Sequence, residues 1–275
     1  MTHGPPWVSP FHYPGREMLP GCSSAGPLAT RRDPERDRSM SAIESQLASN
    51  LAALDQRIRA AAARAGRSPN EITLVVVTKY APDAAVLALE KFQRLELGEN
   101  RPQQLVRRAD IARWAHWHLI GRLQTNKVKA VLPATVLIHS VDTVKLLERI
   151  SQAAMDLRQT CPVLLEINIS GEASKQGFEP DVLRRVWADI LKLPGIELRG
   201  LMTMAPFSDD PEDARPVFRK LREFRDELQE RTGGDLTHHP LRDLSMGMTG
   251  DFEVAIEEGA TLIRVGSAVF ENIPQ

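Results

Sequence analysis

The sequence contains little that marks a secreted, membrane-spanning or nucleic-acid-binding protein. Only two cysteines occur, Cys22 and Cys161, which argues against a disulfide framework or a zinc site and fits a reducing cytoplasm. Apolar runs are strand-sized, too short to span a bilayer. The formal net charge is -1, so no charge excess predicts nucleic acid or an anionic membrane as the main partner.

The first forty residues differ from the rest of the chain. They are rich in proline and include the charged run R-R-D-P-E-R-D-R, without apolar periodicity. Such a segment cannot bury enough surface to offset its ordering entropy, and it lacks the continuous apolar region of a secretory signal. We therefore expect residues 1–40 to be a disordered tail, or to precede a true start at Met40. An organelle transit peptide fits less well, because acidic residues intrude.

A helix is predicted directly after Met40. Ser41 and Glu44 have the S-x-x-E spacing of a capping box. An apolar stripe follows at helical spacing, and Gly66 is the expected stop. The folded domain is therefore expected to span residues 41–275. The stripe consists of Ile43, Leu47, Leu51, Leu54 and Ile58.

Strand-like and helical patterns alternate through this domain. Alternation of this kind predicts a parallel sheet with helical crossovers. Eight repeats in roughly 235 residues match a single (β/α)8 TIM-type barrel. A doubly wound open sheet is the alternative, but no G-x-G-x-x-G follows the first strand. The expected strands are 72–79, 95–100, 116–121, 136–141, 163–170, 198–205, 243–248 and 261–267.

The ends of the seventh and eighth strands carry residues suited to binding phosphate. In (β/α)8 barrels the chemistry lies at the carboxyl ends of the strands, and phosphate commonly binds at the loops after strands seven and eight. These segments read L-S-M-G-M-T-G-D and I-R-V-G-S-A-V-F. The alternative is that their glycines only permit tight turns. The candidate phosphate residues are Ser245, Gly247, Gly266 and Ser267.

The first strand ends in a lysine, in the segment V-V-V-T-K. Barrel closure would place Lys79 beside the eighth strand and its phosphate site. It could be a solvated strand end, a phosphate cation, or, as a buried amine with a lowered pKa, a nucleophile towards an aldehyde. Pyridoxal 5'-phosphate (PLP) carries both a phosphate and an aldehyde. Arg264, on the same strand face as Gly266, would reach the ring nitrogen and weaken its electron-sink behaviour.

Eight segments, in order and spread over the whole domain from about residue 41 to 270, carry a resemblance to a known family. They are V-V-V-T-K, L-G-E-N, W-H-L-I-G-R-L-Q-T-N-K, I-H-S-V-D, E-I-N-I-S-G-E-A-S-K-Q-G, L-R-G-L-M-T-M-A, L-S-M-G-M-T-G-D-F-E-V-A-I and I-R-V-G-S-A-V-F. With these segments the chain resembles the pyridoxal phosphate homeostasis protein family, also called proline synthetase co-transcribed homologues. This family shares the fold-type III barrel of the alanine racemase N-terminal domain.

The resemblance implies that PLP is bound to Lys79 as a Schiff base, the internal aldimine. It also implies a role in intracellular homeostasis of vitamin B6 and amino acids, with no catalytic residue assigned. Apo PLP enzymes are the expected recipients, the chain is expected to be a monomer or weak homodimer, and Lys175 is a candidate gate or transfer residue. The cofactor-binding residues implied are Lys79, Asn100, His118, Asn168, Met202, Ser245, Gly247, Arg264, Gly266 and Ser267.

An amino-acid racemase of the same fold type is the alternative function. Such racemases need a second base on the opposite face of the ring, a tyrosine from the C-terminal β-domain of a partner subunit. The sequence has only Tyr13, in the tail, and Tyr80, beside the lysine, and no residues after the barrel to build that domain. We therefore expect a binding protein rather than an enzyme.

Two further features concern metals and the pocket rim. His116 and His118 share a strand face and His238-His239 are adjacent, but no carboxylate or cysteine completes a recognisable ligand set. We expect no metal, with a strand-end histidine in the pocket and a solvated pair in a loop. Arg101-Pro102 departs from the family pattern of an aromatic and an aliphatic residue, although Pro102 suits the first turn of a helix.

Overall fold

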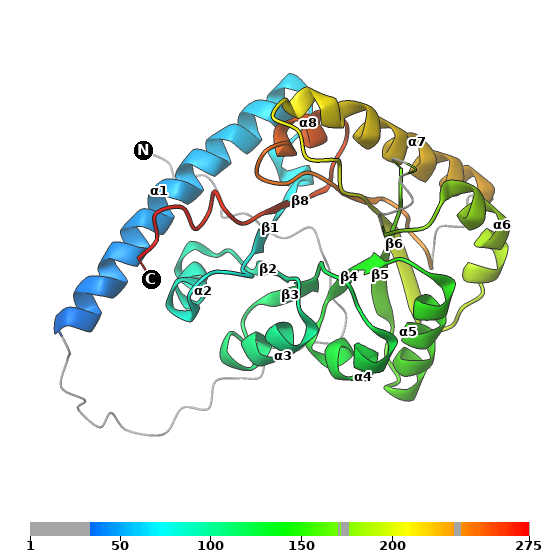
Figure 1. Ribbon diagram of the computed structural model, residues 1–275, viewed down its shortest axis with the longest axis horizontal. Coiled ribbons are helices and arrows are strands. Elements are labelled where there is room, and N and C mark those ends of the chain that lie inside the picture. Colours follow the sequence, from blue (N-terminus) through cyan, green and yellow to red (C-terminus); the bar gives the residue numbers. More distant parts are fainter. Residues whose placement is uncertain (1–33, 170, 172–175, 234–237, 275) are drawn as a thin grey trace.

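Eight parallel strands close into a barrel in chain order, with the helices outside it (Figure 1). The computed structural model describes residues 34–169, 171, 176–233 and 238–274. The predicted barrel is confirmed and the open sheet is excluded, because β1 pairs with β8 as well as with β2. The strands are β1 (Thr73–Val77), β2 (Glu96–Glu99), β3 (His116–Leu119), β4 (Leu137–Val141), β5 (Cys161–Glu166), β6 (Ile196–Met202), β7 (Asp243–Ser245) and β8 (Leu262–Val265).

Helices connect successive strands around the barrel. Most predicted strands extend past the observed carboxyl ends, because those residues leave the hydrogen-bonded ladder and form the rim loops. Short 3-10 helices occupy Pro69–Glu71, Leu89–Phe92, Thr125–Lys127, Leu132–Ala134 and Pro211–Ala214. The α-helices are α1 (Pro34–Arg64), α2 (Asp83–Ala88), α3 (Pro102–Ile111), α4 (Val128–Val131), α5 (Val144–Asp156), α6 (Pro180–Ile190), α7 (Arg215–Arg231) and α8 (Phe252–Glu257).

Helix α1 begins earlier than the sequence predicts. It starts at Pro34, so Ser41 lies inside the helix and the predicted capping box is wrong. Proline suits the first helical position, where its fixed φ is preorganised and its missing N–H is not needed. The end is as predicted, with Gly66 at φ +65°. Residues 1–33 lie outside the described residues, so the disordered tail stays a prediction.

The apolar stripe of α1 covers the seam where β8 meets β1. All five predicted stripe residues are buried, and α1 packs against α8 and α2. The Asn50 side chain donates hydrogen bonds to the carbonyl oxygens of Val269 (2.9 Å) and Glu271 (2.8 Å). This ties the segment after β8 alongside α1 (Figure 1). Within the described part of the chain no helix follows β8, and α1 takes that place in the outer layer.

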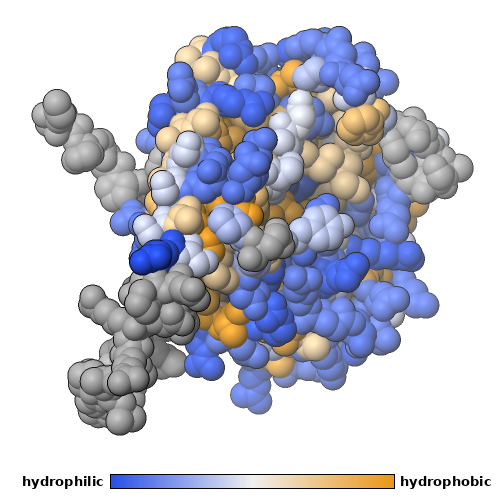
Figure 2. Space-filling model, turned by 60° about the vertical axis from the view of Figure 1, so that its left-hand side comes forward, coloured by the Kyte–Doolittle hydropathy of each residue, from blue (hydrophilic) through white to orange (hydrophobic). Residues whose placement is uncertain are grey.

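Apolar side chains fill two regions, one between strands and helices and one inside the barrel. The inner cluster unites residues from strands on opposite sides of the barrel, which is possible only in its interior. The face shown in Figure 2 is largely hydrophilic, with hydrophobic residues visible in patches between the hydrophilic ones. None of the helices in the described part of the chain could span a lipid bilayer. The inner cluster consists of Val75, Ile120, Val136, Leu137, Leu164, Met202 and Leu262.

Candidate cofactor site

Lys79 lies in a turn at the carboxyl end of β1. The Ala81 N–H donates to the carbonyl of Thr78 (2.9 Å) and closes this turn. The Lys79 side chain is exposed, with Nζ 5.0 Å from the centre of the Tyr80 ring. The expectation of a buried amine is therefore wrong, because the turn carries the lysine out of the ladder to the rim. At the rim the amine is open to a molecule that enters from solvent.

The predicted neighbourhood of Lys79 and the end of β8 is confirmed. Val75 pairs with Arg264 and Val76 with Val265. A Cβ added to Gly266 would lie only 2.8 Å from the carbonyl oxygen of Val77. Glycine is thus required at position 266, where the segment after β8 approaches the end of β1. The contact lies two residues before the lysine.

The loops after β7 and β8 meet at the same rim. The Ser267 hydroxyl donates to Thr249 Oγ1 (2.8 Å), while Gly247 has φ +92° and is packed against the start of α8. The N–H groups of Val269 and Phe270 bond the Gly266 carbonyl (3.0 and 3.1 Å), which forms a helical turn. Ser267 lies in the first turn, where backbone N–H groups receive no partner from the helical turn itself. Such N–H groups suit an anion.

A chain of buried polar side chains crosses the barrel below this rim. Arg264 donates from a terminal guanidinium nitrogen to Ser245 Oγ (2.7 Å). Ser245 Oγ lies 2.8 Å from His139 Nδ1, and His139 Nε2 lies 2.9 Å from His118 Nδ1. His118 Nε2 lies 2.8 Å from Glu96 Oε2. The side chains of five strands therefore join into one network.

The charge state of the network follows from burial and its partners. Burial, His118 and Arg264 hold the pKa of His139 well below its ordinary value, so His139 is neutral. Burial opposes the ionisation of Glu96, but hydrogen bonds from His116 and His118 outweigh it and lower its pKa to about 2. With a carboxylate at one end and an arginine donor at the other, each member donates to the next, from Arg264 towards Glu96.

Arg264 is held in place from two sides. Besides Ser245, it donates to the carbonyl of Thr203 (3.0 Å), and its side chain is buried. Burial lowers its pKa to about 10, against the opposing effect of Asp251 and Glu166, so the guanidinium stays charged near neutrality. The hydroxyl of Ser245 is engaged by this arginine and is fully buried. Its predicted contact with phosphate stays a prediction.

Glu166, the last residue of β5, is an ionisable group that the sequence analysis did not single out. Burial and Asp142 raise its pKa to about 7, although Arg264 lowers it. Glu96 and His139 are not among the predicted site residues either. The available signal was alternation, since Glu96 is two residues from Gly98 and so shares its face of β2.

The remaining predicted residues lie around the rim or in the interior. Asn100 directly follows β2, and a Cβ on Gly121 would lie 2.3 Å from its carbonyl oxygen, so the ends of β2 and β3 approach closely. Asn168 Oδ1 accepts from the Gly171 N–H (3.1 Å). Met202 belongs to the apolar cluster inside the barrel. Lys175 and Tyr13 lie outside the described residues.

Four described histidines, His116, His118, His139 and His239, take part in hydrogen bonds. Among the described residues, no group of three or more His, Cys, Asp or Glu side chains could hold a metal ion. His116 and His118 both bond Glu96. The predicted solvated loop pair is wrong for His239, which is buried because its ring accepts from the Leu198 N–H (3.3 Å) and bonds the Leu191 carbonyl (3.1 Å).

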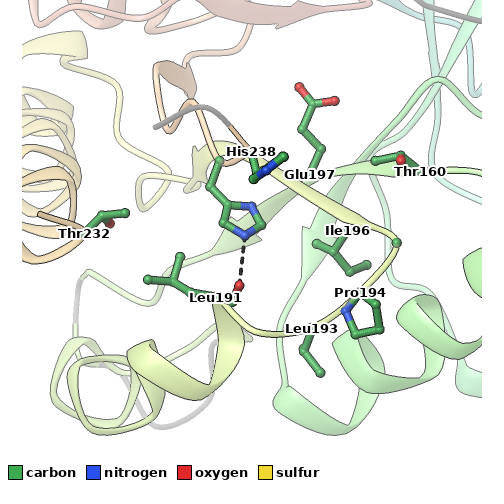
Figure 3. A pocket seen from close by; sticks show the side chains of 10 residues that line it. Thr160, Leu191, Leu193, Pro194, Ile196, Glu197, Thr232 and His238 are labelled. Carbon is green, nitrogen blue, oxygen red and sulfur yellow. Dashed lines mark hydrogen bonds between the residues drawn. The ribbon is translucent and has the colours of Figure 1, made fainter. Parts of the chain in front are cut away.

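A pocket lies at the opposite end of the barrel from Lys79. It has a volume of about 590 Å³ and is formed where β6 begins and α6 ends. Figure 3 shows the hydrogen bond of a histidine ring to the Leu191 carbonyl at its wall. Because functional residues of such barrels lie at the carboxyl ends of the strands, this pocket is separate from the predicted site.

Comparisons with known proteins agree with this geometry. The family model described as alanine racemase, N-terminal domain, matches residues 49–274. The pyridoxal phosphate homeostasis protein of Aquifex aeolicus is 43% identical over 217 residues, which covers 78% of this chain and 93% of that protein. The protein of the same name from Pseudomonas aeruginosa is 36% identical over 228 residues, covering 82% and 95%.

Among solved structures, PipY of Synechococcus elongatus with PLP bound superposes with a TM-score of 0.71. It is 30% identical and covers 82% of this chain and 99% of PipY. Family model, curated relatives and solved structure thus agree over most of the described barrel. The chain belongs to the pyridoxal phosphate homeostasis protein family, whose barrel is that of the alanine racemase N-terminal domain.

Proposed function

We propose that this protein binds PLP covalently through Lys79, at the carboxyl face of the barrel, and takes part in intracellular homeostasis of vitamin B6 and amino acids. The observation that carries the proposal is the closure of β8 onto β1. It sets Gly266 against Val77 and so places the glycine-rich rim beside the turn of Lys79. When bound, PLP supplies an aldehyde carbon that can condense with an amine, with loss of water.

The residues of this face fit the cofactor. The exposed amine of Lys79 is available to the aldehyde. Gly266 and Ser267 offer backbone N–H groups and a hydroxyl to the phosphate, next to Gly247. Arg264 provides a fixed cation for the ring nitrogen, since Ser245 and the Thr203 carbonyl hold its guanidinium. PipY, with PLP bound, and the names of the curated relatives support the same cofactor.

We further propose that the protein holds or transfers PLP without turning over an amino acid. Tyr80 is the only tyrosine in the described residues, and it lies on the lysine's own turn, with its ring 5.0 Å from Nζ. A racemase needs its second base on the opposite face of the ring. The open position of Lys79 suits transfer to apo PLP enzymes, because a partner can reach the amine from solvent.

Titration of PLP into the apo protein tests the proposal. We expect the wild type and a control variant, Lys91→Ala, to develop the same absorbance band of a lysine-bound cofactor. Lys91 is an exposed lysine paired with Glu44, away from the rim. Lys79→Ala should lack the band, and its retention there would refute the assignment. Measured racemisation of amino acids by the loaded wild type would refute the non-catalytic role.

A further inference from the structure

Arg108 on α3 is buried beneath the turn that carries Lys79. Its side chain is only 3% exposed, which is unusual for an arginine. The guanidinium donates to the carbonyl oxygens of Thr78 and Ala81, both at 2.5 Å. These two carbonyls bracket the lysine in the chain. A single side chain therefore holds both ends of the turn.

A buried carboxylate completes this cluster. Arg108 is paired with Glu99 of β2, which is fully buried. Glu99 Oε1 also accepts from the Thr78 hydroxyl (2.6 Å), and the Thr78 N–H donates to the Gly98 carbonyl (2.9 Å). The turn after β1, the end of β2 and helix α3 are thus joined by one ion pair.

The cluster lies outside the barrel, away from the proposed cofactor. A Cβ on Gly98 would lie 2.3 Å from Ile120 Cδ1, inside the barrel. Glu99, the next residue, therefore points the other way, towards α3. Neither Glu99 nor Arg108 is placed to touch a molecule bound at the rim. Any effect on the site passes through the turn.

Stability alone is a poor explanation for this ion pair. Burying two charges costs desolvation energy, and well-packed apolar residues in place of a buried pair are often neutral or stabilising. The arrangement is also imperfect, because Glu99 Oε2 is buried without a hydrogen-bond partner in the described structure. An apolar pair could not donate hydrogen bonds to the backbone carbonyls of the turn.

We propose that Arg108 is a positioning residue for Lys79, holding the turn so that the amine emerges beside Gly266. The inference rests on the proposed function for the role of Lys79. The planar guanidinium is needed because it reaches two carbonyls and two carboxylates, those of Glu99 and Asp83, from one rigid group, which an ammonium cannot do.

The neighbouring arginine offers a matched control. Arg107 is exposed, and its guanidinium bonds only the Asp83 carboxylate within the described residues (2.7 and 2.8 Å). Arg107→Met removes the same charge one residue away. It leaves the bonds of Arg108 to Thr78 and Ala81 in place, and Asp83 keeps its contact with Arg108 Nε (3.3 Å). Because Arg108→Met alone strands the buried Glu99 carboxylate, we pair it with the double variant Arg108→Met/Glu99→Leu, which removes both charges and keeps the fold testable.

Two measurements separate positioning from folding. Hydrogen exchange of the apo protein reports the Ala81 N–H, whose bond to Thr78 closes the turn. The rate at which added PLP becomes fixed to Lys79, with borohydride quenching, reports the position of the amine. In the double variant we expect exchange of the Ala81 N–H to become faster and fixation of PLP at Lys79 to become slower, each by about tenfold or more. Small displacements of reacting groups are costly. Exchange in β5 and α5 should stay at wild-type rates, and Arg107→Met should match the wild type throughout.

The proposal would be overturned if the double variant kept wild-type exchange at Ala81 and wild-type fixation at Lys79. It would also be overturned if exchange rose equally in β5 and α5, because the cluster would then act on global stability. Failure of the proposed function looks different. The wild type itself would fix no PLP at Lys79, while the exchange measurement would still test the hold of Arg108 on the turn.

Discussion

Replacing Gly247 by alanine should destabilise the rim loop after β7 while leaving most of the barrel unaffected. Gly247 has φ +92°, a conformation that costs an L-residue roughly 1–2 kcal/mol. The new Cβ would lie 2.6 Å from Ala255 Cβ and 2.9 Å from Phe252 Cα. Because Phe252 Cα is backbone, the start of α8 must shift, at about 1–3 kcal/mol. The expected loss of unfolding free energy is therefore about 2–5 kcal/mol.

Gly250 in the same loop provides the control. A Cβ there meets no atom within 4 Å, so Gly250→Ala should change the unfolding free energy by about 0.5 kcal/mol or less. Urea denaturation followed by circular dichroism measures both variants. If Gly247→Ala and Gly250→Ala were equally stable, the reasoning that glycine is required at this close approach would be refuted.

Two further predictions concern the buried polar groups. The pKa of Glu166 is about 7 in the folded protein against 4.5 ordinarily, so its contribution to stability is fully present below pH 4.5 and is lost as the pH rises through 7. As the pH rises from 5 to 8, the unfolding free energy of Glu166→Gln in urea should therefore increase relative to that of the wild type. If the difference between the two proteins did not change with pH, burial would not raise the pKa of Glu166. Ser245→Ala leaves a donor of Arg264 and the Nδ1 of His139 without this partner, and should cost about 1–3 kcal/mol. Thermal unfolding of Ser245→Ala measures this loss of stability, and an unfolding midpoint equal to that of the wild type would contradict the prediction.

The barrel and the place of its site could be predicted because both follow from local pattern and simple topology. Alternating strand and helix patterns identify the parallel sheet, and closure necessarily brings β8 beside β1. That is enough to place Lys79 near Gly266. The strand limits were less accurate, since the residues after each ladder keep a strand-like composition while they form rim loops.

The features that the sequence did not reveal depend on contacts between distant residues. The exposure of Lys79 follows from a turn held by Arg108, which lies on another element. The polar network depends on the barrel register, which brings Glu96 and His118 together from neighbouring strands. His239 was misjudged because its partners lie 41 and 48 residues away. Ser41 matches a capping pattern but does not cap the helix, because α1 begins at Pro34.

Peptide mapping shows whether PLP is covalently attached at Lys79. The loaded protein is reduced with borohydride and digested, and the modified lysine is identified by mass spectrometry. We expect a single major adduct on the peptide that contains Lys79, absent from Lys79→Ala. An adduct mainly on another lysine, or PLP retained with no covalent adduct at all, would contradict it.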